Sequence, residues 1–364
     1  MIKSCIYNTM LKHTHLIYRF YVIIFIVLAF ISQGCKDNPS GPDGNINSNY
    51  EIAYHRWINN NWEIYLNSLS RNTSKNISNF SYEDSDCKWS PDGKSIVYTH
   101  FNNRAADIYL YNIKTNENIN LTPDDTYISQ APVWSPDGKS ILFSYHKVPE
   151  SQCTYIMNYD GSNKRKLLDY EAKIYFFADC NNFLYKPVAV FDERENYIYK
   201  TNIDRTYNEL ILDLRTVAHD YATVFDFNTR DNKLLILASD EKDKPNFIIT
   251  YDLTSKTIDT LIKAGEDHSI SCPRYSHDFT KIALYEYTSD YKSMRLCLFD
   301  LKAKPLKYLL DIASSEEWLD FRPPVFSPND KYLAYVKNTN QPGPWFTWKS
   351  SLYIMELSTG KIQY

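Results

Sequence analysis

Short apolar segments separated by polar turns recur along residues 50–364. In six places an aromatic residue is followed seven positions later by an apolar triplet. The six aromatic residues are Trp89, Trp134, Phe176, Phe227, Tyr275 and Phe326. They are 42 to 51 residues apart, a spacing typical of four-stranded propeller blades. We interpret each aromatic residue as a structural anchor on the innermost strand of a blade, and the following triplet as the second strand.

A third strand pattern recurs independently. Seven triplets fit it, starting at Ile64, Ile108, Thr154, Ile198, Ile248, Leu296 and Leu352, and a turn with a short polar strand follows each. The second strand also has a seventh copy, at Ile52-Ala-Tyr54. These counts predict an all-β fold, a seven-bladed β-propeller of four-stranded antiparallel blades. A six-bladed ring is the alternative, but it would leave one set of strands with unpaired edges. The inner strand of the first blade would fall at residues 45–50, unless that blade lacks one.

An octapeptide marks two of the blades. Trp-Ser-Pro-Asp-Gly-Lys-Ser-Ile occurs at Trp89–Ile96 and again at Trp134–Ile141. Proline, aspartate and glycine are the residues that a tight turn between two strands requires. The motif resembles the TolB-like (WD40-like, PD40-repeat) β-propeller repeat, and the resemblance covers residues 50–364. It implies a propeller from a group that includes periplasmic binding proteins, the propellers of prolyl-oligopeptidase-type peptidases and many lipoproteins. Because a signal and a short linker precede the propeller and the chain ends just after its last strand, we expect a single domain.

The N-terminus has the features of an export signal. Lys3, Lys12 and Arg19 precede an apolar stretch at 21–32, which is short for a membrane span. The stretch leads into Ser32-Gln-Gly-Cys35, which resembles the lipobox of bacterial lipoproteins. We therefore predict a lipoprotein signal peptide at 1–34, and a lipidated Cys35 with a flexible tether at 35–49. By analogy with lipoprotein sorting, Lys36 in the position after Cys35 favours the outer membrane, with either face open.

Composition and motifs argue against several function classes. The net charge of −4 and the pI of about 6.1 provide no basic footprint for nucleic acid. No Gly-x-Ser-x-Gly motif of a serine hydrolase occurs. His55, His100 and His146 each lie near the end of a second strand, but no two histidines after the predicted signal peptide have metal-binding spacing. We predict no catalytic residue, no metal site and no cofactor.

One face of the ring is the candidate binding face. Because strands alternate in direction, the loops entering each blade share a face with the loops between its second and third strands. The entering loops are acidic, at Asp84, Asp125, Asp220, Asp267 and Asp320. Aromatic residues gather on the same face where the last and first blades meet, at Trp57, Trp62, Trp318, Trp345, Phe346 and Trp348. The alternatives are ordinary polar loops and a loop that covers the ring closure with its own aromatic rings.

These features predict a non-catalytic cell-envelope lipoprotein that acts as a scaffold for a protein or peptide. A membrane would hold it through the N-terminal lipid, and an envelope protein or peptide would dock on the acidic and aromatic face. A carbohydrate-binding lipoprotein is the second hypothesis, with a glycan stacked on the aromatic residues. A propeller lyase or hydrolase that uses histidine and acidic groups is the third. Nucleic acid is not among the predicted partners.

Overall fold

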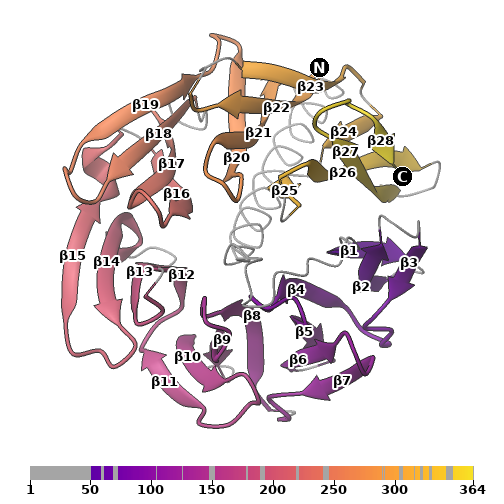
Figure 1. Ribbon diagram of the computed structural model, residues 1–364, viewed down its shortest axis with the longest axis vertical. Helices are drawn as coiled ribbons and strands as arrows, with labels where there is room; N and C mark the ends of the chain where they lie inside the picture. The colour runs from indigo at the N-terminus through magenta and orange to yellow at the C-terminus, as the bar shows by residue number, and fades with distance from the viewer. Residues whose placement is uncertain are drawn as a thin grey trace, which may run out of the picture.

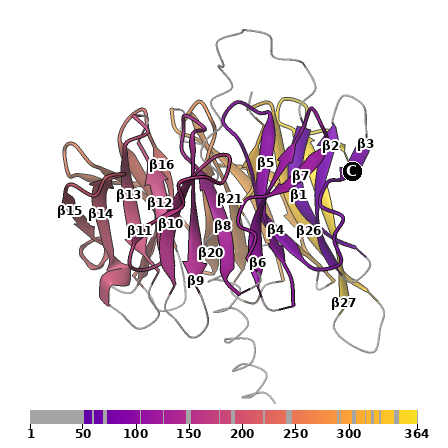
Figure 2. The ribbon, with the colours of Figure 1, turned by 90° about the horizontal axis from the view of Figure 1, so that it is seen from below.

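The computed structural model arranges β-strands in a ring around a central axis (Figure 1). It describes residues 51–58, 61–68, 73–103, 105–124, 126–146, 152–177, 179–188, 193–218, 221–240, 246–288, 290, 292–302, 306–314, 316–319, 323–327, 330–341 and 347–363, with the backbone alone for 51, 55, 57, 58, 341, 347–350 and 363. Cys35, the predicted signal peptide and tether, and residues 45–50 lie outside the described residues. Seen from the side, the strands run roughly along the axis of the ring (Figure 2).

The described strands form sheets in chain order, which confirms the all-β class with antiparallel four-stranded blades. Three sheets are separate four-stranded meanders, β12–β15, β16–β19 and β20–β23. Two further meanders, β4–β7 and β8–β11, are joined into one eight-stranded sheet by a parallel contact between Ala106 and Ile128. The first sheet, β1-β2-β3, has three described strands. This grouping follows the predicted seven-blade pattern, and the count of blades stays a prediction.

The four strand positions of a blade differ in their distance from the axis (Figure 1). The innermost strands are β4 (Asp84–Trp89), β8 (Ile128–Trp134), β12 (Ala172–Phe176), β16 (Tyr221–Asn228), β20 (His268–Tyr275) and, in two pieces, β24 (Glu317–Leu319) with β25 (Val325–Phe326). The second strands are β1 (Glu51–Ile58), β5 (Ser95–Phe101), β9 (Ser140–His146), β13 (Asn182–Pro187), β17 (Lys233–Ser239), β21 (Lys281–Thr288) and β26 (Tyr332–Gln341). Pro323 and Pro324 precede β25, and proline cannot donate to a strand ladder.

The outer two positions complete each sheet. The third strands are β2 (Asn61–Ser68), β6 (Ala106–Asn112), β10 (Cys153–Asn158), β14 (Tyr197–Asn202), β18 (Phe247–Asp252), β22 (Met294–Asp300) and β27 (Thr347–Glu356). The outermost strands are β3 (Thr73–Asn76), β7 (Glu117–Asn120), β11 (Arg165–Leu168), β15 (Asn208–Asp213), β19 (Ile258–Lys263), β23 (Leu306–Ile312) and β28 (Ile362–Gln363). Two short 3-10 helices, η1 (Glu193–Asn196) and η2 (Leu214–Thr216), lie in loops.

The spacing of seven residues between aromatic anchor and second strand corresponds to a register in the sheet. In all six blades with a described inner strand, the anchor and the residue seven positions later are Cα partners. The pairs are Trp89 with Ile96, Trp134 with Ile141, Phe176 with Phe183, Phe227 with Leu234, Tyr275 with Ile282 and Phe326 with Leu333. Five of the anchors are buried, and Trp89 is partly buried. The anchors therefore lie at or next to the end of the inner strands and pack between blades.

The hydrophobic core is divided among the interfaces between blades. Each buried cluster combines side chains of two successive blades; one, for example, joins Tyr175 and Leu184 to Val224 and Ile236. Second strands such as β5 bury both of their faces because a neighbouring blade covers each face. At the end of the chain, β27 contacts β1. The last and first sheets are thus neighbours, as the sequence predicts.

Candidate functional site

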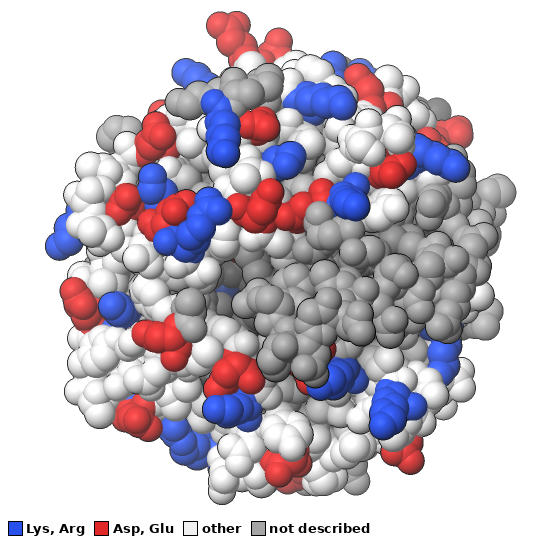
Figure 3. All heavy atoms as spheres, viewed as in Figure 1, with Lys and Arg blue, Asp and Glu red and all other residues white. Residues whose placement is uncertain are grey.

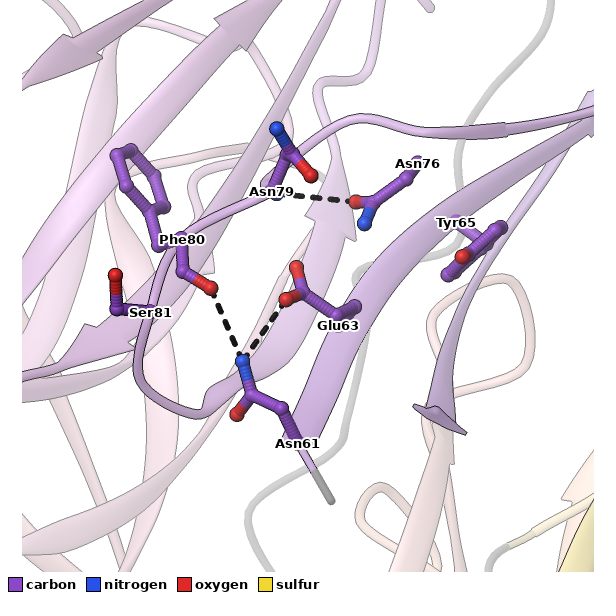
Figure 4. A pocket seen from close by; sticks show the side chains of 7 residues that line it. All are labelled: Asn61, Glu63, Tyr65, Asn76, Asn79, Phe80 and Ser81. Carbon is purple, nitrogen blue, oxygen red and sulfur yellow. Dashed lines mark hydrogen bonds between the residues drawn. The ribbon is translucent and has the colours of Figure 1, made fainter. Parts of the chain in front are cut away.

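A polar pocket lies in the first blade, on the face predicted to bind. It has a volume of about 420 Å³ and is lined by Asn61, Glu63, Tyr65, Asn76, Asn79, Phe80 and Ser81 (Figure 4). Asn61 begins β2, directly after the loop between the second and third strands. Asn79, Phe80 and Ser81 belong to the loop that enters the next blade. The pocket therefore combines the two kinds of loop that the alternating strand directions bring to one face.

Glu63 lies at the base of this pocket, and hydrogen bonds hold its carboxylate in place. Its side chain is buried, its Oε1 accepts from Asn61 Nδ2 at 2.8 Å, and its Oε2 accepts from Ser78 Oγ at 2.8 Å. Asn61 Nδ2 also lies 3.1 Å from the carbonyl oxygens of Phe80 and Tyr82. A buried carboxylate is stable only with such partners. The network joins β2 to the entering loop and fixes the shape of the pocket.

The other side of the pocket has amide and aromatic groups. The Oδ1 of Asn76 accepts from the backbone N–H of Ser78 at 3.2 Å and of Asn79 at 3.0 Å, which orders the loop. Asn79 has a positive φ of 52° and an exposed side chain, a conformation that asparagine tolerates better than most residues. Tyr65 and Phe80 add apolar surface to the lining (Figure 4). The combined surface suits a ligand that is both hydrogen-bonding and partly apolar.

The structure corrects the role expected for Asp84. This residue is fully buried in β4 and pairs across the sheet with His100, whose Nδ1 lies 2.8 Å from Asp84 Oδ1. Burial raises the pKa of the Asp84 carboxyl, although the hydrogen bond with His100 opposes the shift. The ring of His100 packs against Phe80, with 4.3 Å between ring centroids. Asp84 therefore supports the pocket from below and does not belong to an exposed acidic ring.

The remaining predicted acidic residues are only partly visible. Asp267 is exposed in the loop that enters β20, as expected. Asp125, Asp220 and Asp320 lie outside the described residues. The face of the ring that Figure 3 shows has acidic and basic side chains intermixed.

The described members of the predicted aromatic cluster lie on strands. Trp57 and Trp62 are Cα partners at the end of the β1–β2 hairpin, and Trp62 is partly buried. Trp318 was expected in a loop, but it lies in β24 and packs on the core between the last two blades, because this short strand pairs with β26. The backbone of Trp348 lies in β27, next to β1. Trp345 and Phe346 lie outside the described residues.

Sequence reasoning missed Glu63, Asn61 and the asparagines of the pocket. The run Asn76-Ile-Ser-Asn-Phe-Ser81 was the available signal, because asparagine and serine concentrate in ordered turns. Within the described ranges, no group of three or more His, Cys, Asp or Glu side chains is placed to hold a metal ion. Neither described helix, η1 nor η2, is long and apolar enough to cross a membrane.

The sequence was compared with models of protein families. The model of the TolB beta propeller domain (PD40) matches residues 42–182 and 86–273, which together span more than half of the chain. The chain belongs to this family. No curated protein matches it.

Solved structures similar to this chain include TolB and two enzymes. TolB from Acinetobacter baumannii is 18% identical with a TM-score of 0.47, and the alignment covers 86% of this chain but only 62% of TolB. An oligogalacturonate lyase in complex with manganese is 10% identical with a TM-score of 0.55, covering 86% of this chain and 83% of the lyase. A puromycin-hydrolysing peptidase from Mycobacterium tuberculosis is 11% identical with a TM-score of 0.62, covering 92% of this chain and 54% of the peptidase. At these identities the likeness concerns the fold.

Proposed function

We propose that this TolB-family propeller is a non-catalytic, lipid-anchored scaffold of the cell envelope that binds a protein or peptide. The observation that carries the proposal is the ordered polar pocket of the first blade. It lies on the loop face of the first blade, whose strand β1 contacts β27 of the last sheet. The family assignment supports an envelope role, and the Ser32-Gln-Gly-Cys35 segment supports lipid anchoring.

The chemistry of the pocket fits part of a peptide chain. The carboxylate of Glu63 attracts a cationic or N–H-bearing group, while Asn76 and Asn79 offer amide donors and acceptors. Tyr65 and Phe80 add surface for an apolar side chain. Interfaces that combine aromatic contact with a few oriented polar groups are typical of specific recognition.

Site-directed photo-crosslinking in cells tests this proposal. A photoreactive amino acid replaces Ser81, which is exposed and lines the pocket, and a matched control replaces Lys94, which is exposed in the turn of the first octapeptide. We expect Ser81 adducts with one or a few envelope proteins, identified by mass spectrometry, that Lys94 does not form. The same adducts from both positions, or none from Ser81, would contradict the proposal.

A glycan is the second candidate ligand, because amide side chains beside aromatic rings also suit a sugar. A glycan array distinguishes the two. Saturable binding of one glycan class that Asn79→Ala weakens would favour the carbohydrate-binding hypothesis over the peptide scaffold.

A further inference from the structure

Two lysines face each other at the inner edge of the ring. Lys173 in β12 and Lys186 in β13 are Cα partners, and directly opposite residues of an antiparallel pair lie on the same face of the sheet. Like charges in this arrangement are destabilising. Both side chains are half-buried. Two cations therefore share one face of the sheet at this position.

The ammonium of Lys173 is held against the next blade. Its Nζ donates to the backbone carbonyl of Val224 in β16 at 2.7 Å, and the hydroxyl of Tyr175 donates to the same oxygen at 2.8 Å. Lys173 Nζ also lies 5.3 Å from the ring centroid of Phe225 and 5.6 Å from that of Tyr175. Such cation–π contacts stabilise a cation that has lost part of its water. The ammonium group of Lys173 is thus held between β12 and β16.

Arg274 adds a third cation from the blade that begins with β20. Burial lowers the pKa of Lys173 well below its usual range, and the charges of Lys186 and Arg274 lower it further. Arg274 belongs to β20, an inner strand two blades beyond β12 (Figure 1), and its neighbour Tyr275 donates its backbone N–H to Asp226 of β16. Asp226 supplies a nearby negative charge, but its carboxylate oxygens accept from the backbone N–H of Phe227 at 2.9 Å and of Tyr275 at 3.0 Å.

We propose that Lys173, Lys186 and Arg274 form a binding site for a carboxylate group at the inner edge of the ring. The guanidinium of Arg274 can hold a carboxylate through two parallel hydrogen bonds, and the lysines supply the remaining charge. The ring of Phe225 provides apolar contact for the part of the ligand next to the carboxylate. The group can come from a small organic acid or from the C-terminus of a peptide. This site does not depend on the pocket of the first blade.

Titration calorimetry on the full chain tests the site with two kinds of probe. Succinate represents a small organic acid, and Gly-Gly-Leu with a free C-terminus is compared with its C-terminal amide. Saturable binding of succinate alone assigns the site to small acids. Binding of the free peptide that its amide lacks assigns the site to chain ends. No saturable binding of either carboxylate, or equal affinity for the free and amidated peptides, would overturn the proposal.

Variants connect the binding to the three cations. Lys173→Met and Arg274→Gln should each weaken binding about tenfold or more, because each removes a charge-assisted hydrogen bond. Arg274→Lys, which keeps the charge, should lose less than Arg274→Gln. Lys94→Met is the matched control, because Lys94 is exposed in a turn, and it should bind as the unaltered chain does. Thermal unfolding of every variant identifies any that does not fold.

Proton uptake gives a readout that a purely structural role would not change. A bound carboxylate favours the charged form of Lys173, so binding at a pH between the lowered pKa of Lys173 and the usual lysine pKa should take up protons. Calorimetry in two buffers with different heats of ionisation measures this uptake, and Lys173→Met should reduce it. Binding with the same proton uptake and affinity in Lys173→Met would exclude Lys173 from the site.

Discussion

Two regions of the blade differ in how far they keep their geometry. The turns between first and second strands repeat one geometry, whereas the inner strands vary from blade to blade. Four turns share one hydrogen-bond pattern, in which a serine N–H donates to the carbonyl five residues later and the serine Oγ accepts from that residue's N–H. The serine pairs with its partner as Ser90 with Ser95, Ser135 with Ser140, Ser276 with Lys281 and Ser327 with Tyr332. Phe279 stands at the position equivalent to Gly93. Its φ of 54° is positive, as is the φ of Gly93. The geometry of the turn is therefore kept where its sequence has changed.

The inner strands keep their geometry less strictly, and apart from the aromatic anchor their side chains differ from blade to blade. Three residues before the anchor stand Asp86, Ala131, Lys173 and Cys272 in four different blades. At Asp86, Ala131 and Cys272 the backbone has a positive φ within a shift of register, whereas β12 pairs with β13 without one. Bulges of this kind re-aim side chains. Repetition thus identifies the architecture. The differences between equivalent inner positions coincide with the carboxylate site that we propose at the inner edge of the ring.

The largest effect should come from removing a buried anchor. Trp134 is 3% exposed, packs among Val97, Leu110 and other buried residues, and donates from Nε1 to the carbonyl of Lys88 at 3.3 Å. Trp134→Ala should lower the free energy of unfolding by about 3–5 kcal/mol, measured by denaturant titration. Trp89→Ala, at the equivalent but partly exposed position, is the control and should cost less. If Trp89→Ala lowered the free energy of unfolding as much as Trp134→Ala or more, burial of the anchor would not be what stabilises the blade.

Removing a charge at the inner edge of the ring should raise stability instead of lowering it. Lys173→Met should raise the free energy of unfolding by about 1–2 kcal/mol, because a desolvated cation beside two others is replaced by an apolar side chain of similar length. The pKa of Lys173 is lowered in the folded state, so the unfolded chain binds more protons. Stability of the unaltered protein should therefore rise with pH from the folded pKa towards the usual lysine pKa, and this rise should shrink in Lys173→Met. Lower stability of the variant at neutral pH would show that the lysine is structural.

The smallest effect should come from the backbone of a turn. Gly93 has a φ of 68°, and a Cβ at this position would have open space around it. Gly93→Ala should therefore cost about 1 kcal/mol through backbone conformation alone. Gly93→Asn should cost less, since asparagine adopts this conformation more readily. If thermal unfolding gives both variants the same stability, the positive φ is not what this turn requires.

Most of the fold could be predicted from the sequence, but less of the candidate site could be. The aromatic anchors and their spacing indicated the strands because each seven-residue interval spans one tight turn between directly paired residues. Asp84 was misplaced because its one-dimensional pattern, an acidic residue near the start of a strand, is shared by exposed and buried carboxylates. Its partner His100 is sixteen residues away, and only the pairing of β4 with β5 brings them together.

The sequence by itself determined the repeating strands, the turn chemistry and the membership of the propeller family, because these depend on local periodicity and on residues close together in the chain. The tertiary structure alone decided the pocket around Glu63 and the cationic group of Lys173, Lys186 and Arg274. Lys173 and Arg274 are about a hundred residues apart and meet only because the blades curve into a ring. Charge and burial act through distance in space, and a linear pattern does not contain that distance.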